Sequence, residues 1–288
     1  MATSDAELEA QLMEAGKKLL DPPSSAEEIL PLLDEVESCL SRVDQSPTVS
    51  MQSALAPSLK AMIDERLFKH TDADVKVAVA SCISEITRIT APEAPYSDDQ
   101  MRDVFQLIVS SFGDLADNTS RSFNKRTMIL ETVAKVRSCV VMLDLECDAL
   151  IIEMFQLFLN SIRDYHQESV FSSMEMIMTL VLEESEEISV ELLSPILASL
   201  RKDNKEVLPI AQKLGEKVLE NCAPKLEPYL TQAVKSLGKS IDNYSGVVAS
   251  ICPDVPETVE QNDGRAADEN KIDAPSEEIP EAVQEIVV

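Results

Sequence analysis

Apolar residues recur at steps of three and four positions from about residue 5 to about residue 252, with polar residues between them. This spacing is typical of amphipathic helices that bury one face. We therefore expect an all-α protein whose helices, with boundaries uncertain by a few residues, lie at 5–20, 26–43, 50–68, 73–90, 98–116, 122–143, 147–165, 168–184, 189–201, 205–221, 224–237 and 241–251.

Residues 73–90 show the pattern most clearly and also show where it stops. The expected buried face consists of Val75, Val79, Cys82, Ile83, Ile86 and Ile89. Pro92 and Pro95 lack backbone donors and hold Ala91 and Ala94 away from the helical region. We therefore expect residues Ala91, Pro92, Glu93, Ala94, Pro95 and Tyr96 to form a rigid, extended loop, which is a candidate protein-docking edge.

Helix starts recur regularly along the chain. Several resemble capping boxes, in which a serine and an acid or amide three positions later satisfy free backbone donors; the examples are Ser4 with Glu7, Ser25 with Glu28 and Ser97 with Gln100. Helices taken in pairs repeat roughly every 40 to 47 residues, the range of HEAT and armadillo repeats. The fold prediction is an α-solenoid of stacked antiparallel helix pairs over residues 1–252.

Two helices have predicted places in this stack. Apolar residues nearly encircle the segment 151–159, so we expect neighbours to cover it on more than one side, in the middle of the array. The first helix has only a narrow stripe of Leu8, Leu12, Ala15 and Leu19 among charges, which is typical of a terminal repeat.

The composition supports the helical assignment and changes the view of the last residues. Six glycines and no tryptophan in 288 residues argue against a β-rich fold. Residues 253–288 carry 11 acidic and 2 basic residues and no aromatic side chain, so we expect a disordered acidic tail. Because the whole chain has a formal charge of −27, direct binding to nucleic acid or to an anionic membrane is disfavoured.

The cellular compartment can be predicted from the N-terminal residues, the hydropathy and the cysteines. The first residues lack the pattern of a signal peptide, and no uncharged apolar run reaches the roughly 20 residues that span a bilayer. Six scattered cysteines have no paired spacing and fit a reducing compartment, so we expect an intracellular protein. We also expect it to be a monomer.

Candidate catalytic and metal sites are weak. Residues 144–148 imitate the opening of a calcium loop, but Ala149 and Phe155 stand where glycine and glutamate are needed, so the acids are expected to begin a helix. The two histidines and six cysteines have no zinc-ligand spacing, and no phosphate-binding glycine loop or nucleophile elbow occurs. Methionines 174, 176 and 178 are expected to fill the core. We expect no cofactor and no catalysis.

Residues 121–126 form the densest basic cluster, with Arg121, Lys125 and Arg126 at the start of a predicted helix. Most such clusters are solvated. The alternative is a contact for an acidic peptide or a small phosphorylated ligand, because arginine and backbone donors at a helix start suit anions.

Several segments resemble the "precocious dissociation of sisters" family of cohesin-associated HEAT-repeat proteins. The resemblance rests on His70-x-Asp-x-Asp-Val-Lys76, Ala80-x-Cys-Ile-x-Glu-Ile-x-Arg-Ile-x-Ala-Pro-Glu-Ala-Pro-Tyr96, Ser122-Phe-Asn-Lys-Arg126, Leu130-Glu-Thr-Val-Ala-Lys-Val-Arg-Ser138, Glu191-Leu-Leu193 and Leu226-Glu-Pro-Tyr-Leu230. Asp21-Pro-Pro-Ser-Ser25 and Val247-Val-Ala-Ser-Ile-Cys252 look like its plant branch. The similarity covers nearly all of residues 5–252.

This resemblance implies a nuclear, non-catalytic regulator of sister chromatid cohesion. Family membership implies binding to cohesin and its release and acetylation factors, roles in chromosome segregation and recombinational DNA repair, and a docking role for residues 91–95. Family members are much longer, so we expect an N-terminal segment, a truncated paralogue that binds regulators without stable cohesin attachment, or an alternative product. Periodicity alone also allows a generic α-solenoid adaptor, such as a trafficking or phosphatase scaffold.

Overall fold

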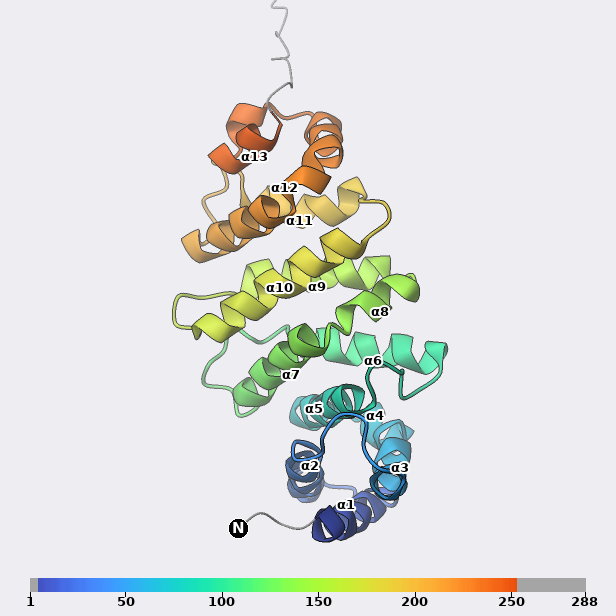
Figure 1. The fold of residues 1–288 in the computed structure, drawn as a ribbon. Coiled ribbons are helices and arrows are strands. Elements are labelled where there is room, and N and C mark those ends of the chain that lie inside the picture. Colours follow the sequence, from blue (N-terminus) through green and yellow to red (C-terminus); the bar gives the residue numbers. More distant parts are fainter. Residues whose placement is uncertain (1–4, 253–288) are drawn as a thin grey trace, which may run out of the picture. The chain divides into compact units, whose positions relative to one another are not determined.

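The computed structural model describes residues 5–252, which contain thirteen α-helices and one short 3-10 helix (Figure 1). The helices are α1 (Asp5–Leu19), α2 (Ala26–Leu40), α3 (Val49–Met62), α4 (Glu65–Phe68), α5 (Ala73–Thr90), α6 (Asp98–Ser110), α7 (Phe123–Val136), α8 (Cys139–Asp144), α9 (Asp148–Ser161), α10 (Glu168–Glu184), α11 (Val190–Ser199), α12 (Pro209–Ser236), η1 (Ile241–Asn243) and α13 (Gly246–Ile251). Within the described part, the β-structure is one isolated bridge between Arg201 and Tyr244. The predicted acidic tail, 253–288, lies outside the described residues.

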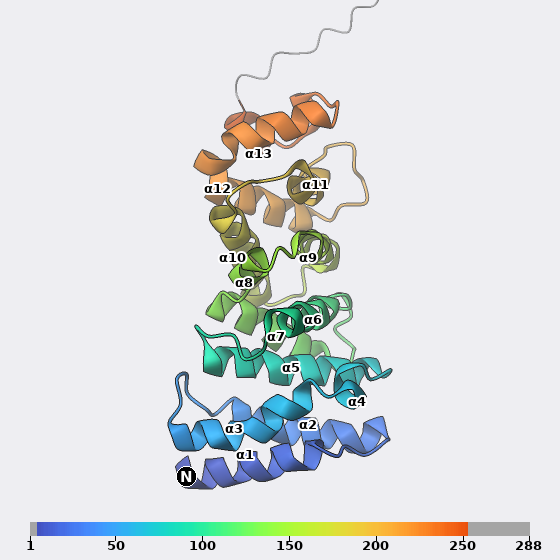
Figure 2. The same cartoon turned by 90° about the vertical axis from the view of Figure 1, so that its right-hand side faces the viewer.

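The helices stack in two rows (Figure 2). In one row α2, α5, α7, α10 and α12 each contact the next, and in the other α6, α9 and α11 do the same. Helices α1 and α3 pack together at the start of the array. The predicted stack of helix pairs is therefore confirmed.

Polar contacts between neighbouring repeats recur at nearly constant sequence separation. The side chains bridge residues 42 to 48 positions apart, in the pairs Gln45 with Ala91, Arg88 with Val43, Ser122 with Asp74, Arg137 with Glu184, Asn221 with Glu175 and Lys225 with Glu183. This separation agrees with the predicted repeat length. We call this series of contacts the repeat ladder.

The packing confirms the two predicted helix positions. Helix α9 contacts α6, α8, α11 and α12, so its nearly continuous apolar surface is covered on several sides. Helix α1 buries Leu8, Leu12, Ala15 and Leu19 against α2 and α3. Gly16 permits the close approach, because a Cβ atom there would lie 2.6 Å from the Ser58 hydroxyl. All six cysteines are free, five of them buried, as expected of small packing residues.

Four predicted helix assignments are wrong, and one of them is the helix at 241–251, where the structure has the separate elements η1 and α13. Residues 50–68 form two helices, because Asp64 starts α4 by accepting a hydrogen bond from the backbone of Arg66. Residues 122–143 also divide, since Arg137 takes a left-handed conformation, φ 58°, between α7 and α8. Residues predicted as separate helices at 205–221 and 224–237 form the single helix α12, with Pro224 and Pro228 inside it.

The capping boxes are only partly present. At the start of α6, the backbone of Ser97 donates to Gln100 at 3.2 Å and the Ser97 hydroxyl donates to the same oxygen at 3.1 Å. The Ser25 side chain makes no capping hydrogen bond to α2. Ser4 lies outside the described residues.

Candidate functional site

The candidate loop begins where α5 ends. Asp72 starts this helix by accepting from the backbone of Val75 at 3.1 Å, and twelve of the eighteen helical residues are buried. At the other end Ala91 is not helical, with φ −53° and ψ 138°, as the proline argument requires. The helix therefore delivers residues 91–96 to one edge of the array.

The loop itself is a turn and not an extended segment, which corrects the prediction. The Ala91–Pro92 peptide is cis, and the backbone of Glu93 donates to Thr90 at 3.1 Å. This hydrogen bond closes a four-residue turn from Thr90 to Glu93.

Two hydrogen bonds tie this turn to the connection between α2 and α3. The Gln45 side chain donates to the Ala91 carbonyl at 2.7 Å, and the Ser46 backbone donates to the Ile89 carbonyl at 3.1 Å. Ser46 adopts a left-handed φ of 58° there. Both connecting loops therefore meet at the end of α5.

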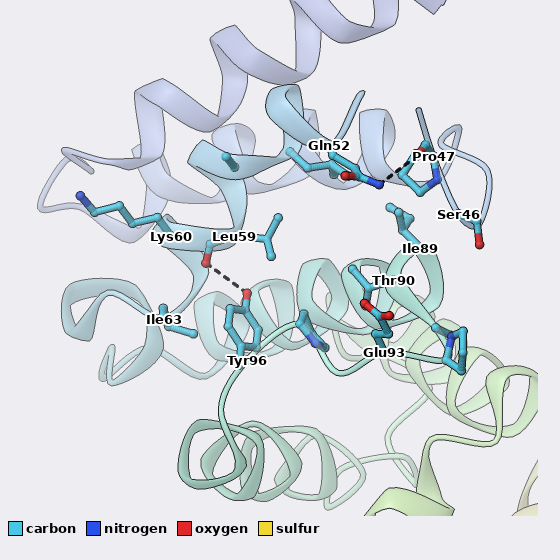
Figure 3. A pocket seen from close by; sticks show the side chains of 15 residues that line it. Ser46, Pro47, Gln52, Leu59, Lys60, Ile63, Ile89, Thr90, Glu93 and Tyr96 are labelled. Carbon is cyan, nitrogen blue, oxygen red and sulfur yellow. Dashed lines mark hydrogen bonds between the residues drawn. The ribbon is translucent and has the colours of Figure 1, made fainter. Parts of the chain in front are cut away.

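Helix α3 forms the opposite wall of a cavity of about 770 Å³ (Figure 3). We call it the turn groove. Its lining comprises Ser46, Pro47, Gln52, Leu55, Ala56, Leu59, Lys60, Ile63, Ile89, Thr90, Ala91, Pro92, Glu93, Pro95 and Tyr96. Concave sites with mostly apolar walls and a few polar groups are typical of ligand and peptide binding.

Tyr96 joins the two walls of the turn groove. Its hydroxyl donates to the Leu59 carbonyl on α3 at 3.1 Å (Figure 3). Burial, together with the nearby Cys82 thiol, raises the pKa of Tyr96 above its ordinary value. A tyrosine hydroxyl with its ordinary pKa is already protonated at physiological pH, so Tyr96 can donate this bond there, and the raised pKa extends that range upward.

The rim of the turn groove has one charge of each sign. Lys60 on α3 and Glu93 on the turn are both exposed, whereas Leu55 and Ile89 are buried in the floor. The site therefore offers a solvent-exposed, nearly neutral rim around an apolar interior, which suits an apolar side chain of a peptide.

The structure gathers most of the predicted docking residues at the turn groove. Ala91, Pro92, Glu93, Pro95 and Tyr96 line it, and Ala94 is exposed beside it. Sequence reasoning missed the wall from α3, formed by Leu55, Leu59 and Ile63. Their four-residue spacing was a signal of a helical face, but nothing local indicated that this face meets a turn some 35 residues later.

A polar network supports the turn groove from behind. Arg88 pairs with Glu85 at 2.8 Å and donates to the carbonyls of Leu40 and Val43 at 3.0 and 2.9 Å. Thr132 of α7 donates to Glu85 at 3.5 Å. The end of α5 is thus fixed to helices α2 and α7.

The second predicted site, the basic cluster, contains two cations that the protein itself engages. Lys125 pairs with Asp34 at 3.0 Å and with Glu37. Burial acts to lower the pKa of Lys125, but the hydrogen bonds to Glu37 and Asp34 outweigh it and hold the pKa above its ordinary value.

Arg126 is 4% exposed and pairs with Asp114 at 3.0 Å, and it also donates to the Ser111 carbonyl. Arg121 is exposed. The structure therefore divides the cluster into two cross-links between helices and one surface arginine. Anion binding by all three side chains together stays a prediction. It would cost free energy, because Lys125 and Arg126 would have to leave their carboxylate partners.

Residues 5–252 contain no cluster of three or more histidine, cysteine, aspartate or glutamate residues that could hold a metal ion. No helix in this part of the chain is long and apolar enough to cross a membrane. Of the acids in residues 144–148, Asp148 begins α9 as expected, whereas Asp144 ends α8 and Glu146 lies between the two helices.

Comparison with known proteins places the chain in a family. Residues 27–257 match the family model described as "Sister chromatid cohesion protein PDS5 protein". The chain is 65% identical over 252 residues to the PDS5 homolog C of Arabidopsis thaliana, covering 88% of this chain and 29% of that protein. It is 32% identical over 230 residues to the PDS5 homolog B-B of Xenopus laevis, covering 78% of this chain and 16% of that protein.

A solved structure supports the same fold. A chain from "Structure of the Pds5-Scc1 complex and implications for cohesin function" matches with a TM-score of 0.64 and 23% identity, covering 79% of this chain and 36% of that one. The present chain spans less than a third of the curated relatives it matches. The family match over most of the described residues and the shared solenoid identify this chain as a member of the PDS5 family of sister chromatid cohesion proteins.

Proposed function

We propose that this chain is a non-catalytic interaction module that acts in sister chromatid cohesion by holding a peptide segment of a cohesin regulator in the turn groove. One observation carries the proposal: the loop singled out by family resemblance forms a wall of an apolar groove of about 770 Å³. A groove with an apolar floor and few charges binds a peptide segment that inserts an apolar side chain into it, and this binding requires no catalytic group.

The partners follow from the family. The relatives are named sister chromatid cohesion proteins, and the solved relative is in a complex with Scc1. By that kinship, the proposed partners are cohesin and its release and acetylation factors, and the proposed place of action is chromatin in the nucleus. Roles in chromosome segregation and recombinational repair belong to the same proposal.

A groove-filling substitution tests the proposal directly. Ala56 is exposed on α3 and lines the turn groove, so Ala56→Trp fills it with little effect on the core. Ala10 is exposed on α1 and outside the groove, so Ala10→Trp is the matched control. Purified cohesin subunits, including Scc1, and release and acetylation factors are captured on each variant after circular dichroism has established equal helicity.

Loss of at least one regulator with Ala56→Trp, and its retention with Ala10→Trp, supports the proposal. Equal capture by both variants removes the turn groove from the mechanism. Two variants at Glu93 test the rim. Because an exposed ion pair contributes under about 1 kcal/mol, Glu93→Gln weakens the binding of a cationic partner by up to about fivefold, and the reversal Glu93→Lys weakens it further.

Two neighbouring hypotheses make different predictions in the same assay. A truncated paralogue captures the release or acetylation factors but not the cohesin subunits. A generic adaptor captures neither set.

A further inference from the structure

A second groove lies toward the other end of the array, outside the turn groove. It has a volume of about 1190 Å³. Two connecting loops form its sides, the loop between α8 and α9 and the loop between α10 and α11, and Tyr229 and Gln232 of α12 also line it. We call it the acidic groove. Its position between successive repeats places segments about 40 residues apart side by side.

One side carries three exposed carboxylates. Asp144 ends α8, Glu146 lies in the loop with a left-handed φ of 54°, and Asp148 begins α9. These three residues belong to the segment 144–148, which imitates the opening of a calcium loop. Their carboxylates line the groove, and they belong to no group of residues capable of holding a metal ion in the described part of the chain.

The other side carries four more exposed carboxylates, from Glu184, Glu186, Glu187 and Glu191. The lining of this groove includes no lysine or arginine, although the chain as a whole has 25 of them against 52 acids. The negative charge is therefore concentrated here beyond the average of an acidic protein.

Two cations come near this side. Arg137 pairs with Glu184 at 3.1 Å, while Lys225 donates to the backbone carbonyls of Glu183 and Ser185. Glu184 is thus paired with a cation of the protein itself. Lys225 donates to backbone carbonyls at the end of α10 and pairs with none of the carboxylates that line the groove. The remaining charge is available to a ligand.

The floor of the acidic groove is apolar. Ile151, Ile188 and Leu192 are buried, and Ile152 and Tyr229 are half-buried at its surface. A cation alone would use only the rim. A ligand that matches both parts needs positive charge on either side of an apolar group.

Charge also excludes other occupants. Nucleic acid and anionic lipid are repelled by seven carboxylates, and so is the chain's own segment 253–288, which carries a net charge of −9. A second copy of this acidic chain is disfavoured for the same reason.

We propose that the acidic groove binds a basic peptide segment of a partner protein, in which lysines or arginines flank an apolar side chain. The apolar side chain packs on Ile152 and Tyr229, and the flanking cations approach the carboxylates of both loops. This site is independent of the turn groove and of the function proposed for it.

Fluorescence anisotropy with labelled synthetic peptides tests the proposal on the full chain. The probe has lysines on both sides of one leucine, and two further peptides replace the leucine by serine or the lysines by glutamate. The groove variant is Glu186→Gln with Glu187→Gln and Glu191→Gln. The matched control removes three exposed charges elsewhere, by Glu27→Gln, Glu28→Gln and Glu131→Gln.

The proposal expects about tenfold weaker binding of the lysine–leucine peptide to the groove variant, and less than about twofold weakening for the control. Replacing the peptide's leucine by serine weakens binding to the parent chain, and Ala56→Trp in the turn groove leaves it unchanged.

Three results overturn the proposal. Equal losses in the groove and control variants show general charge attraction. A peptide whose leucine does not matter excludes the apolar floor. A concentration-dependent dimer that the groove variant disrupts assigns the face to a second copy of the chain.

Discussion

The turn groove and the acidic groove have the same architectural origin but opposite chemistry. Each lies where connecting loops of successive repeats meet a helix wall. The turn groove has one lysine and one glutamate at its rim, and hydrogen bonds join its walls. The acidic groove has seven carboxylates in its lining. A solenoid fixes the spacing of its loops, so the residues in the loops decide what each groove binds.

The largest expected effect concerns the Lys125 cross-link of the basic cluster, which joins α7 to α2. Lys125→Met leaves the buried Glu37, 7% exposed, without its cation and is expected to lower the free energy of unfolding by about 3 kcal/mol. Denaturant unfolding measures this loss. The double variant Glu37→Gln, Lys125→Met recovers part of it, and Arg121→Met, at the exposed member of the cluster, changes it by less than about 0.5 kcal/mol. Similar losses for Lys125→Met and Arg121→Met would contradict the structural role of Lys125.

Tyr96 gives the next largest effect and separates the two grooves. Tyr96→Ala removes a half-buried ring and the bond to Leu59, with an expected cost of about 2 kcal/mol. Tyr96→Phe removes the hydroxyl alone and costs about 1 kcal/mol. The lysine–leucine peptide should bind both folded variants as it binds the parent chain. A change in that affinity would show that the two grooves are coupled.

Gly16 on α1 and Gly215 on α12 lie toward opposite ends of the array, and substitution of either is expected to lower the free energy of unfolding by a similar amount. A Cβ atom at Gly16 would lie 2.6 Å from the Ser58 hydroxyl, and one at Gly215 would lie 2.7 Å from the Ser199 hydroxyl. Gly16→Ala and Gly215→Ala are each expected to cost about 1–2 kcal/mol by overpacking, as measured by thermal or denaturant unfolding. Gly246→Ala meets nothing within 4 Å and is the control. A neutral result at Gly16 or Gly215 would show that the helices there separate freely.

The smallest expected effect is a pH dependence from the middle of the array. His166 contacts the Leu115 carbonyl at 2.8 Å and accepts from the backbone of Arg163, and burial lowers its pKa below the ordinary 6.5, with a smaller contribution from Arg163. Since the unfolded chain takes up a proton near pH 6.5 and the folded chain only at lower pH, this contribution to stability is present above pH 6.5 and is lost as the pH falls toward the folded pKa. His166→Gln should flatten the decline in unfolding free energy between pH 7 and pH 5.5. The same slope in both proteins would assign it to other groups.

The sequence predicted elements well where the signal was local. Helix α5 has its buried face, its Asp72 start and its stop at Pro92 as expected, because propensity and packing favour the same boundaries. Arg137 shows the opposite case. Arginine has no preference for a left-handed backbone, so the break between α7 and α8 has no signature in the residue type. Pro224 and Pro228 strongly suggest a break, yet α12 continues, since it packs on α10 and α11.

The sites were predicted only on the side that a motif marks. The turn from Ala91 to Tyr96 was identifiable, but its partner wall on α3 depends on which helix the solenoid places opposite. The acidic groove was missed for the same reason. Its two loops each appeared as an ordinary acidic helix boundary, and only the stacking of repeats brings them together.

The repeat ladder has a mechanical consequence. Its bridges join residues only 42 to 48 positions apart, so each connects a repeat to the adjacent one along the chain. Under a pulling force applied at the two ends, a chain held by such bridges lengthens in steps of one repeat, except where Lys125 joins α7 to α2 across two repeats, and the repeats that have not yet opened keep their grooves.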